Sequence, residues 1–205
     1  MANCEISILL QRNGRRLRIC TLAFILIALA SHCNAKEQSN WAATLYVGRL
    51  TDARLGETVI GDFKFEDAYF TGLGLMRRIY TYRHYFDLEL EGQVNKFFGD
   101  QNNWEFDLFG YIRWLPFPWD QYLDTSFAAG AGLSYATSVP EIEVKNQGKS
   151  AQFLGALSFE FEFALPRIPQ WSLVAGIHHR SGAGGSFSGV KSASNGLDIG
   201  IRYKF

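Results

Sequence analysis

Two polar residues with the spacing His-x-Ser, His179 and Ser181, stand at the end of the hydrophobic stretch W-S-L-V-A-G-I. On a β-strand, residues i and i+2 point to the same side, and their Cα atoms lie about 6.5–7 Å apart. An imidazole can span that gap and take the proton of a serine hydroxyl, as in nucleophilic serine catalysis. The pattern therefore permits a catalytic Ser–His pair, although periodicity alone favours two ordinary rim residues in headgroup water.

Glycine-rich sequence follows the serine and could complete such a site. The backbone N–H groups of Gly182, Ala183 and Gly184 could hold the oxyanion that develops when an ester is attacked. The chain contains neither the G-x-S-x-G elbow of α/β-hydrolases nor the H-E-x-x-H motif of zinc proteases, so it lacks the common signatures of two other hydrolase classes. The H-x-S pair is therefore the strongest candidate for catalysis.

The N-terminus has the pattern of an export signal. A basic region contains Arg12, Arg15, Arg16 and Arg18, and residues 19–30 form an apolar run of twelve residues, too short to span a bilayer as a helix. Cys33-Asn34-Ala35 then offers a cleavage site, so we expect residues 1–35 to be a signal peptide. A lipoprotein acylated at Cys33 and an uncleaved membrane anchor are the alternatives, and His32 before Cys33 disfavours the first.

Composition narrows the function of the expected mature chain, residues 36–205. All 3 cysteines (Cys4, Cys20 and Cys33) precede it, which excludes disulfides, cysteine metal sites and thiol nucleophiles. Removing 4 of 20 basic and 1 of 20 acidic residues leaves 16 and 19, a net charge of −3. This balance argues against a nucleic-acid-binding protein.

Eight segments after residue 36 alternate with the period of two that strands have. The clearest is F-E-F-E-F, in which Phe159, Phe161 and Phe163 share one face and Glu160 and Glu162 the other. No segment of this part of the chain shows a convincing amphipathic helical pattern. We therefore expect strands at approximately residues 41–50, 66–78, 84–96, 103–115, 123–137, 151–165, 171–181 and 195–205.

Alternating strands of this kind could form a soluble sandwich or a membrane barrel. The expected strands contain about ten residues or more, the length that crosses a bilayer at a tilt. Their polar faces carry charges of both signs, which suits a narrow lumen filled by ion pairs, and eight strands make the smallest such barrel. We therefore expect an all-β fold, an eight-stranded antiparallel transmembrane barrel of the outer-membrane type.

The connections between strands agree with a bacterial outer-membrane barrel whose termini both lie in the periplasm. Short connections at residues 79–83, 116–122 and 166–170 alternate with longer ones at 51–65, 139–150 and 182–194. Tryptophans would then form two aromatic belts, Trp104 near the outer interface and four near the periplasmic one: Trp41, Trp114, Trp119 and Trp171.

Strand parity divides the polar stretch I-H-H-R-S into two sets. Trp171, Leu173 and Ile177 face lipid, so His179 and Ser181 share the lipid face near the outer leaflet. His178 and Arg180 point into the lumen, where we expect them to join ion pairs. Two polar groups on a lipid-facing surface need a functional reason, and attack on an ester of an adjacent lipid would supply one.

The sequence here resembles the PagL-type lipid A 3-O-deacylases. The resemblance rests on H-R-S-G-A-G at the top of the penultimate strand and on the closing strand N-G-L-D-I-G-I-R-Y-K-F, so it is specific only over residues 176–205. It implies an outer-membrane hydrolase that removes the ester-linked acyl chain at position 3 of lipid A without metal or cofactor. It also implies that His179 is the base and Ser181 the nucleophile, within a motif H-x-S-N-A-G in which this chain has Gly182 in place of Asn.

The resembled family also uses a glutamate to orient the histidine, and this chain lacks it. Two residues could take its place. Asp198 follows a similar turn but has lumen parity, where an ion pair with Arg180 or Arg202 is the simpler expectation, unless a bulge shifts the register. Asn195 has lipid-face parity, and its amide could orient a histidine but could not stabilise imidazolium by charge.

Two classes of function therefore stay open. The first is a Ser/His hydrolase acting on lipopolysaccharide in the outer leaflet. The second is a non-catalytic barrel with a structural or adhesive role, favoured by the missing glutamate and by Gly182. A pore is the weakest hypothesis because eight strands leave little open lumen. The sequence does not fix the oligomeric state and leaves both a monomer and a homodimer open.

Overall fold

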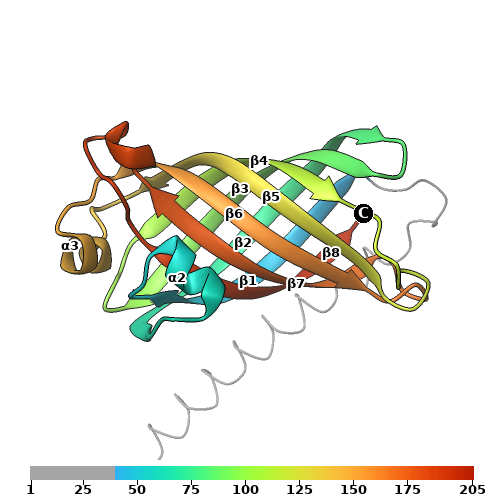
Figure 1. The fold of residues 1–205 in the computed structure, drawn as a ribbon, viewed down its shortest axis with the longest axis horizontal. Helices are drawn as coiled ribbons and strands as arrows, with labels where there is room; N and C mark the ends of the chain where they lie inside the picture. The colour runs from blue at the N-terminus through green and yellow to red at the C-terminus, as the bar shows by residue number, and fades with distance from the viewer. Residues whose placement is uncertain (1–39) are drawn as a thin grey trace, which may run out of the picture. The chain divides into compact units, whose positions relative to one another are not determined.

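The computed structural model describes residues 40–205, in which eight antiparallel strands form a closed barrel (Figure 1). The expected signal peptide, residues 1–35, lies outside the described residues. Each strand pairs with the next, and β8 pairs with β1 to close the sheet. The strands are β1 (Trp41–Thr51), β2 (Phe65–Tyr82), β3 (Phe86–Gly99), β4 (Trp104–Trp114), β5 (Asp124–Ala136), β6 (Phe153–Ala164), β7 (Trp171–Ser181) and β8 (Asn195–Lys204).

The eight strands confirm the alternation found in the sequence, and the closed sheet excludes the soluble sandwich. The largest difference in length is in β2, which continues to Tyr82, beyond the expected end at residue 78. Its last residues pair with the start of β3, Tyr82 opposite Phe86, across a short turn. The turn contains Arg83 at φ 51°, a left-handed conformation that reverses the chain within a few residues.

Short helices occur after residue 36, where the sequence shows no convincing amphipathic helical pattern. The connections contain α2 (Leu55–Ile60), α3 (Glu141–Gln147) and the single 3₁₀ turn η1 (Ala183–Gly185). Each has fewer than eight residues, too few to reveal a helical period, and α2 and α3 end at left-handed glycines, Gly61 and Gly148. None of the helices within residues 40–205 is long and apolar enough to cross a membrane.

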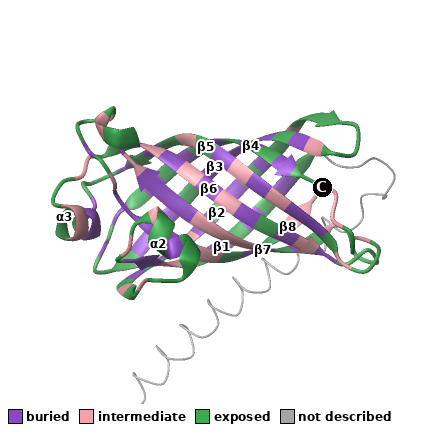
Figure 2. Ribbon diagram, in the orientation of Figure 1, coloured by how far each residue is buried: buried purple, intermediate pink, exposed green. Residues whose placement is uncertain are grey.

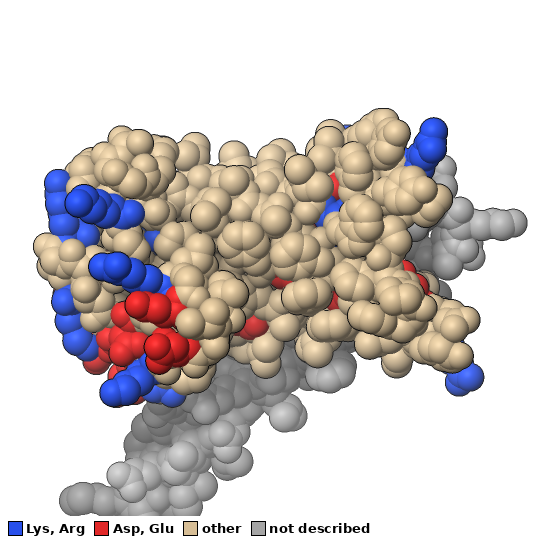
Figure 3. Space-filling model, in the orientation of Figure 1, with Lys and Arg blue, Asp and Glu red and all other residues tan. Residues whose placement is uncertain are grey.

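The two ends of the barrel differ in their connections. We call the end with residues 52–64, 100–103, 137–152 and 182–194 the outer end, and the end with the turns 83–85, 115–123 and 165–170 the inner end. Figure 1 shows α2 and α3 at the same, outer end of the barrel. Figure 3 shows that charged side chains gather mainly at that end of the visible face, where α2 and α3 lie.

Burial alternates along β3 and β4 and over much of the other strands, which gives the checkerboard visible in Figure 2, whereas His178 to Arg180, near the end of β7, are all buried. In β4 the exposed positions are apolar, such as Leu108 and Ile112, while Glu105, Asp107 and Arg113 are buried in the lumen. An apolar wall outside and a polar interior is the pattern of a barrel that spans a membrane. The tryptophans of β1, β4 and β7 are exposed at the ends predicted for them: Trp41, Trp104, Trp114 and Trp171.

Ion pairs fill the lumen, as the charges on the polar faces predicted. Arg202 is fully buried and contacts Glu91, Glu160 and Glu162 at 2.7–3.3 Å. Arg113 pairs with Glu89 at 2.9 Å, with Glu162 at 3.2 Å and also with Glu160, so the two arginines share two carboxylates. Buried charges are tolerated only when each has partners of opposite charge, and here arginines from β4 and β8 pair with glutamates from β3 and β6.

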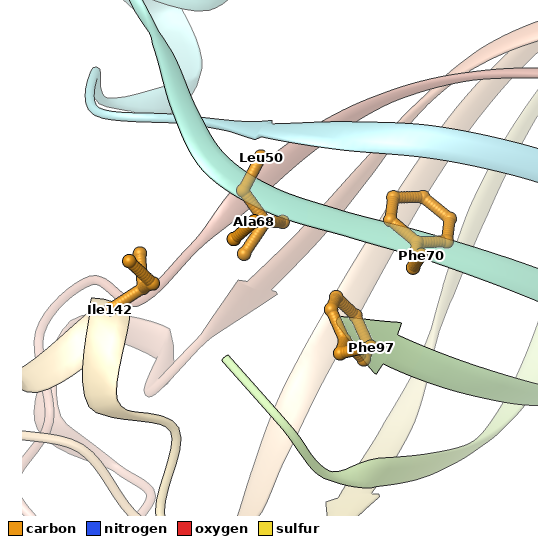
Figure 4. Packing of buried hydrophobic residues seen from close by; sticks show 5 residues of the cluster. All are labelled: Leu50, Ala68, Phe70, Phe97 and Ile142. Carbon is orange, nitrogen blue, oxygen red and sulfur yellow. The ribbon is translucent and has the colours of Figure 1, made fainter. Parts of the chain in front are cut away.

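The outer end of the lumen is closed by apolar residues. Leu50, Ala68, Phe70 and Phe97 point inward from β1, β2 and β3, and Ile142 on α3 packs against them (Figure 4). A second cluster joins Leu154 of β6 to Val190 and Ala193 from the connection that follows β7. The connection between β7 and β8 is therefore folded against the barrel, and this fixes the chain that follows Ser181.

Candidate active site

Three polar side chains form a row across the outer wall, near the outer end. Thr51 of β1 is paired with Asn195 of β8, and Asn195 is paired with His179 of β7. Because directly paired residues of neighbouring strands point to the same face, all three side chains lie outside the lumen. The face predicted for His179 from alternation agrees with this register.

His179 is oriented by Asn195. The ring Nδ1 lies 2.7 Å from Asn195 Oδ1, and His179 and Asn195 are only 5% and 0% exposed respectively. Of the two residues that competed for the orienting role, the structure therefore brings Asn195 to the histidine. No register shift interrupts the pairing of β8 with either β7 or β1, so the bulge that could have turned Asp198 outward is not present.

The first outer connection, residues 52–64, covers this pair. Asn195 Nδ2 donates a hydrogen bond to the carbonyl oxygen of Ala53 at 2.6 Å. The hydroxyl of Thr51 lies 3.2 Å from that of Thr58 on α2 and 3.4 Å from the Asn195 carbonyl oxygen. Sequence reasoning missed these residues. Extending the alternation of the first strand by one residue, from 50 to 51, would have placed Thr51 on the outer face. Nothing in the sequence placed the loop residues Ala53 and Thr58.

Ser181 ends β7 on the same face as His179 and is partly exposed. Its Oγ accepts the N–H of Ala183 at 3.1 Å and contacts the carbonyl oxygen of Lys191 at 3.5 Å. No hydrogen bond joins Ser181 to the His179 ring in the part of the chain that the structure describes. Catalytic hydrogen bonds are often long or misaligned before substrate binds, so a change of side-chain rotamer is required for this pair to act.

The segment expected to supply oxyanion donors is tightly packed on one side and open on the other. Ala183 and Gly184 are exposed, and Ala183 adopts φ 48°, unusual for a residue with a Cβ. Gly182 is buried with ordinary angles, φ −81° and ψ 12°, yet a Cβ there would lie 1.8 Å from the Val190 carbonyl oxygen. Glycine is therefore needed at residue 182 because of packing, and an asparagine could not fit.

The other polar residues of this stretch lie inside the barrel, as alternation predicted. His178 Nε2 is 3.0 Å from Glu105 Oε1, and Arg180 pairs with Glu105 and Glu143 at 3.1 and 2.7 Å. Asp198 also faces inward, where one carboxylate oxygen would lie 3.0 Å from a Cβ at Gly176.

The proposed contact of Asp198 with His179 is therefore wrong. The predicted ion pair of Asp198 with Arg180 or Arg202 is also not formed among residues 40–205, because both arginines are engaged by glutamates.

One group of side chains in the described barrel has the composition of a metal site. Glu105, Asp107 and His178 place ligand atoms within 4.8 Å of one another in the lumen. Glu105 pairs with His178 and Arg180 at 3.0 and 3.1 Å, Asp107 lies 3.9 Å from His178, and all three residues face the opposite side of the sheet from His179. We interpret the group as part of the ion network of the lumen, separate from the outer-wall site.

No protein-family model and no curated protein sequence matches the chain. Among solved structures, the outer membrane enzyme PagL superposes with a TM-score of 0.53 at 10% identity, over 80% of this chain and 99% of that one.

A barrel from the de novo design of transmembrane β-barrels gives 0.51 at 13% identity, over 83% and 98% of the two chains. Neisserial surface protein A gives 0.51 at 13% identity, over 83% and 100%. These likenesses show that the chain has the fold of an eight-stranded outer-membrane β-barrel, a fold shared by an enzyme and by a surface protein.

Proposed function

We propose that this protein is a hydrolase of the bacterial outer membrane that removes an ester-linked acyl chain from lipid A, by 3-O-deacylation. The observation that carries the proposal is the His179–Asn195 pair on the outer wall, with Ser181 on the same face two residues away. The pair is covered by the first outer connection and not exposed to lipid, and polar side chains on the outer wall of a membrane barrel usually have a function. Their place near the outer end matches the outer leaflet, where lipid A would lie.

The proposed reaction divides into two steps. Ser181 Oγ attacks the ester carbonyl carbon while His179 Nε2 takes the hydroxyl proton, and the C–O bond to the sugar then breaks as the histidine protonates the departing sugar oxygen. Water next attacks the acyl-serine, His179 again takes a proton, and the free fatty acid leaves while Ser181 recovers its hydrogen. Asn195 holds the imidazole through Nδ1 during both steps, as the third member of a catalytic triad does.

The chain after Ser181 supplies the groups that stabilise negative charge. The Ala183 N–H already points at Ser181 Oγ, 3.1 Å away, so it lies beside the position where the oxyanion would form. The N–H groups of Gly182 and Gly184 are the other proposed donors. A preorganised donor of this kind contributes about 10²–10³ in kcat in serine hydrolases.

An apolar surface beside the serine suits a fatty acyl chain. Gly155 is paired with Ser181, and a Cβ there would lie 3.4 Å from the ring of Phe187. Phe187 packs against Phe153 with ring centroids 5.9 Å apart. A lipid lying along β6 could therefore place its acyl chain against these rings and its ester near Ser181.

The proposal is tested by mass spectrometry of lipid A from cells that express each variant. Ser181→Ala and His179→Asn should each abolish release of a 3-hydroxy fatty acid, because they remove the nucleophile and the base. Ser186→Ala, an exposed serine in the same connection, is the matched control and should leave release unchanged. Deacylation that persists in Ser181→Ala would refute the proposal.

A non-catalytic structural or adhesive barrel is the second candidate. It is favoured by the buried state of His179, 5% exposed, and by the hydrogen bonds that turn Ser181 toward Lys191 and Ala183. Under this hypothesis, α2 and α3 present a surface at the outer end. Lipid A with the same acyl pattern in cells with and without the protein would favour it.

A further inference from the structure

We infer that the carbonyl oxygen of Ala53, in the first outer connection, is a positioning group that sets the tautomer of His179 through Asn195. The inference rests on the proposed function, in which His179 acts as a base, but it concerns hydrogen bonding that can be measured without catalysis. It assigns a role in the site to residues 52–64, which lie outside the H-x-S motif and on the other side of β8.

The first step concerns the two ends of the Asn195 amide. A backbone carbonyl can only accept hydrogen bonds, so the group 2.6 Å from the Ala53 oxygen must be the NH₂ end. The Oδ1 end is then forced toward His179, at 2.7 Å. Asn195 is fully buried, so water does not compete to turn the amide round.

The second step concerns the imidazole. Because Oδ1 has no hydrogen to donate, His179 must donate from Nδ1, and the proton of the neutral ring is therefore fixed at that nitrogen. Nε2 is left without a proton and can accept one from a serine hydroxyl. Without the Ala53 contact, the amide could rotate and present its NH₂ group to the ring, which would favour the tautomer that cannot act as a base at Nε2.

The same contact explains why an amide rather than a carboxylate stands at residue 195. An aspartate would bring a second oxygen against the Ala53 carbonyl oxygen, two acceptors about 2.6 Å apart with no hydrogen between them. The connection is held in place independently, because Thr58 of α2 is buried against Thr51 of β1 with their hydroxyl oxygens 3.2 Å apart. Residues 52–64 therefore select the side chain that can orient this histidine.

The test uses a variant without the covering connection. Asp52 N–H donates to the Lys64 carbonyl oxygen at 3.0 Å, and Lys64 N–H donates to the Asp52 carboxylate at 2.8 Å, so residues 53–63 can be replaced by a short Asn-Gly turn between them. The readout is the ¹H–¹⁵N correlation spectrum of the histidine rings of the full chain in detergent micelles. A His179→Asn sample identifies the His179 signal.

The expected wild-type signal is a single tautomer protonated at Nδ1. The shortened chain should show a mixture of both neutral tautomers, and Thr58→Val should show a smaller shift in the same direction. Thr71→Val is the control, because it removes a hydrogen bond from the Thr71 hydroxyl on β2 to the Tyr46 carbonyl oxygen on β1, away from His179. It should leave the His179 signal unchanged. An unaltered Nδ1 tautomer in both the shortened chain and Thr58→Val would overturn the inference.

A second measurement covers the case in which the shortened chain does not fold. In the intact chain, Asn195→Asp should lower the folding equilibrium constant by at least about tenfold, because a carboxylate oxygen would repel the Ala53 carbonyl oxygen. Asn195→Ala places no oxygen against that carbonyl and should lower the folding equilibrium constant less. Equal losses for the two variants would count against the Ala53 contact. The spectra do not depend on hydrolysis, so they can also be recorded in Ser181→Ala. Deacylation by Ser181→Ala would refute the proposed function but would leave the tautomer result unchanged.

Discussion

Adding one methyl group at residue 182 tests whether packing of the β7–β8 connection holds the residues beside Ser181 in place. Gly182→Ala introduces a Cβ that would lie 1.8 Å from the Val190 carbonyl oxygen and 2.5 Å from its carbon. These are backbone atoms and cannot rotate away as a flexible side chain could. The φ of −81° is allowed for alanine, so the expected effect comes from the contact alone and not from backbone strain.

The structure sets the magnitude of this effect. Overpacking by one group in a close-packed site costs about 1–3 kcal/mol, which at 1.4 kcal/mol per tenfold lowers the folding equilibrium constant about five- to a hundredfold. Relief requires residues 182–184 to move away from Val190, and the Ala183 N–H would then leave Ser181 Oγ, now 3.1 Å away. Losing that donor should lower the rate of deacylation by about 10².

The assay is urea unfolding in lipid vesicles together with release of 3-hydroxy fatty acid. The matched control is Gly110→Ala in β4, where an added Cβ meets nothing within 4 Å. Because alanine restricts the unfolded chain, the control should be stabilised by about 0.4–1 kcal/mol. If Gly182→Ala matches the control in both stability and activity, the contact with Val190 does not position the segment. Gly182→Asn should be still less stable and less active, although it restores the motif of the resembled family.

Three further predictions concern the barrel itself. Arg202→Met should lower the free energy of unfolding by about 3–5 kcal/mol in urea titrations because it removes the cationic partner of buried glutamates, whereas Arg167→Met in the exposed turn after β6 should change it by less than about 0.5 kcal/mol. Leu108→Arg should cost about 2–4 kcal/mol in vesicles because the charge would face lipid, and a smaller cost would place β4 outside the bilayer. Planar bilayers containing the protein should show negligible single-channel conductance, since Arg113 and Arg202 fill the lumen with their partners; a stable nanosiemens conductance would contradict that packing.

Most of the fold could be predicted from the sequence because strand parity carries so much information. Alternation such as that around Glu160 and Glu162 gave eight strands, their faces and the ion-filled lumen. The helices α2 and α3 were missed because they are too short to show a period and are stabilised by packing against the barrel rim, such as that of Ile142 in the apolar cluster at the outer end.

The candidate site was predictable only where it follows a strand. Parity placed His179, Ser181 and Asn195 on the outer wall and kept Asp198 inside, and the register of β7 with β8 then joins Asn195 to His179. The contact with Ala53 could not be predicted, because it depends on how a loop of thirteen residues folds back over the wall. The rotamer of Ser181 likewise depends on the packing of residues 182–194.

The row Thr51–Asn195–His179 crosses the seam at which the last strand meets the first. Membrane barrels gain this seam only when the sheet closes, so the site has a place in the order of assembly. Before closure, Asn195 would have neither Thr51 nor Ala53 beside it, and by the tautomer inference His179 would have no fixed ring proton. Under the proposed function, a chain whose barrel is not yet closed would therefore be inactive toward lipids, and hydrolysis would begin with the final strand pairing. The pairing of β8 with β1 would then make the proposed hydrolysis depend on completed insertion of the barrel.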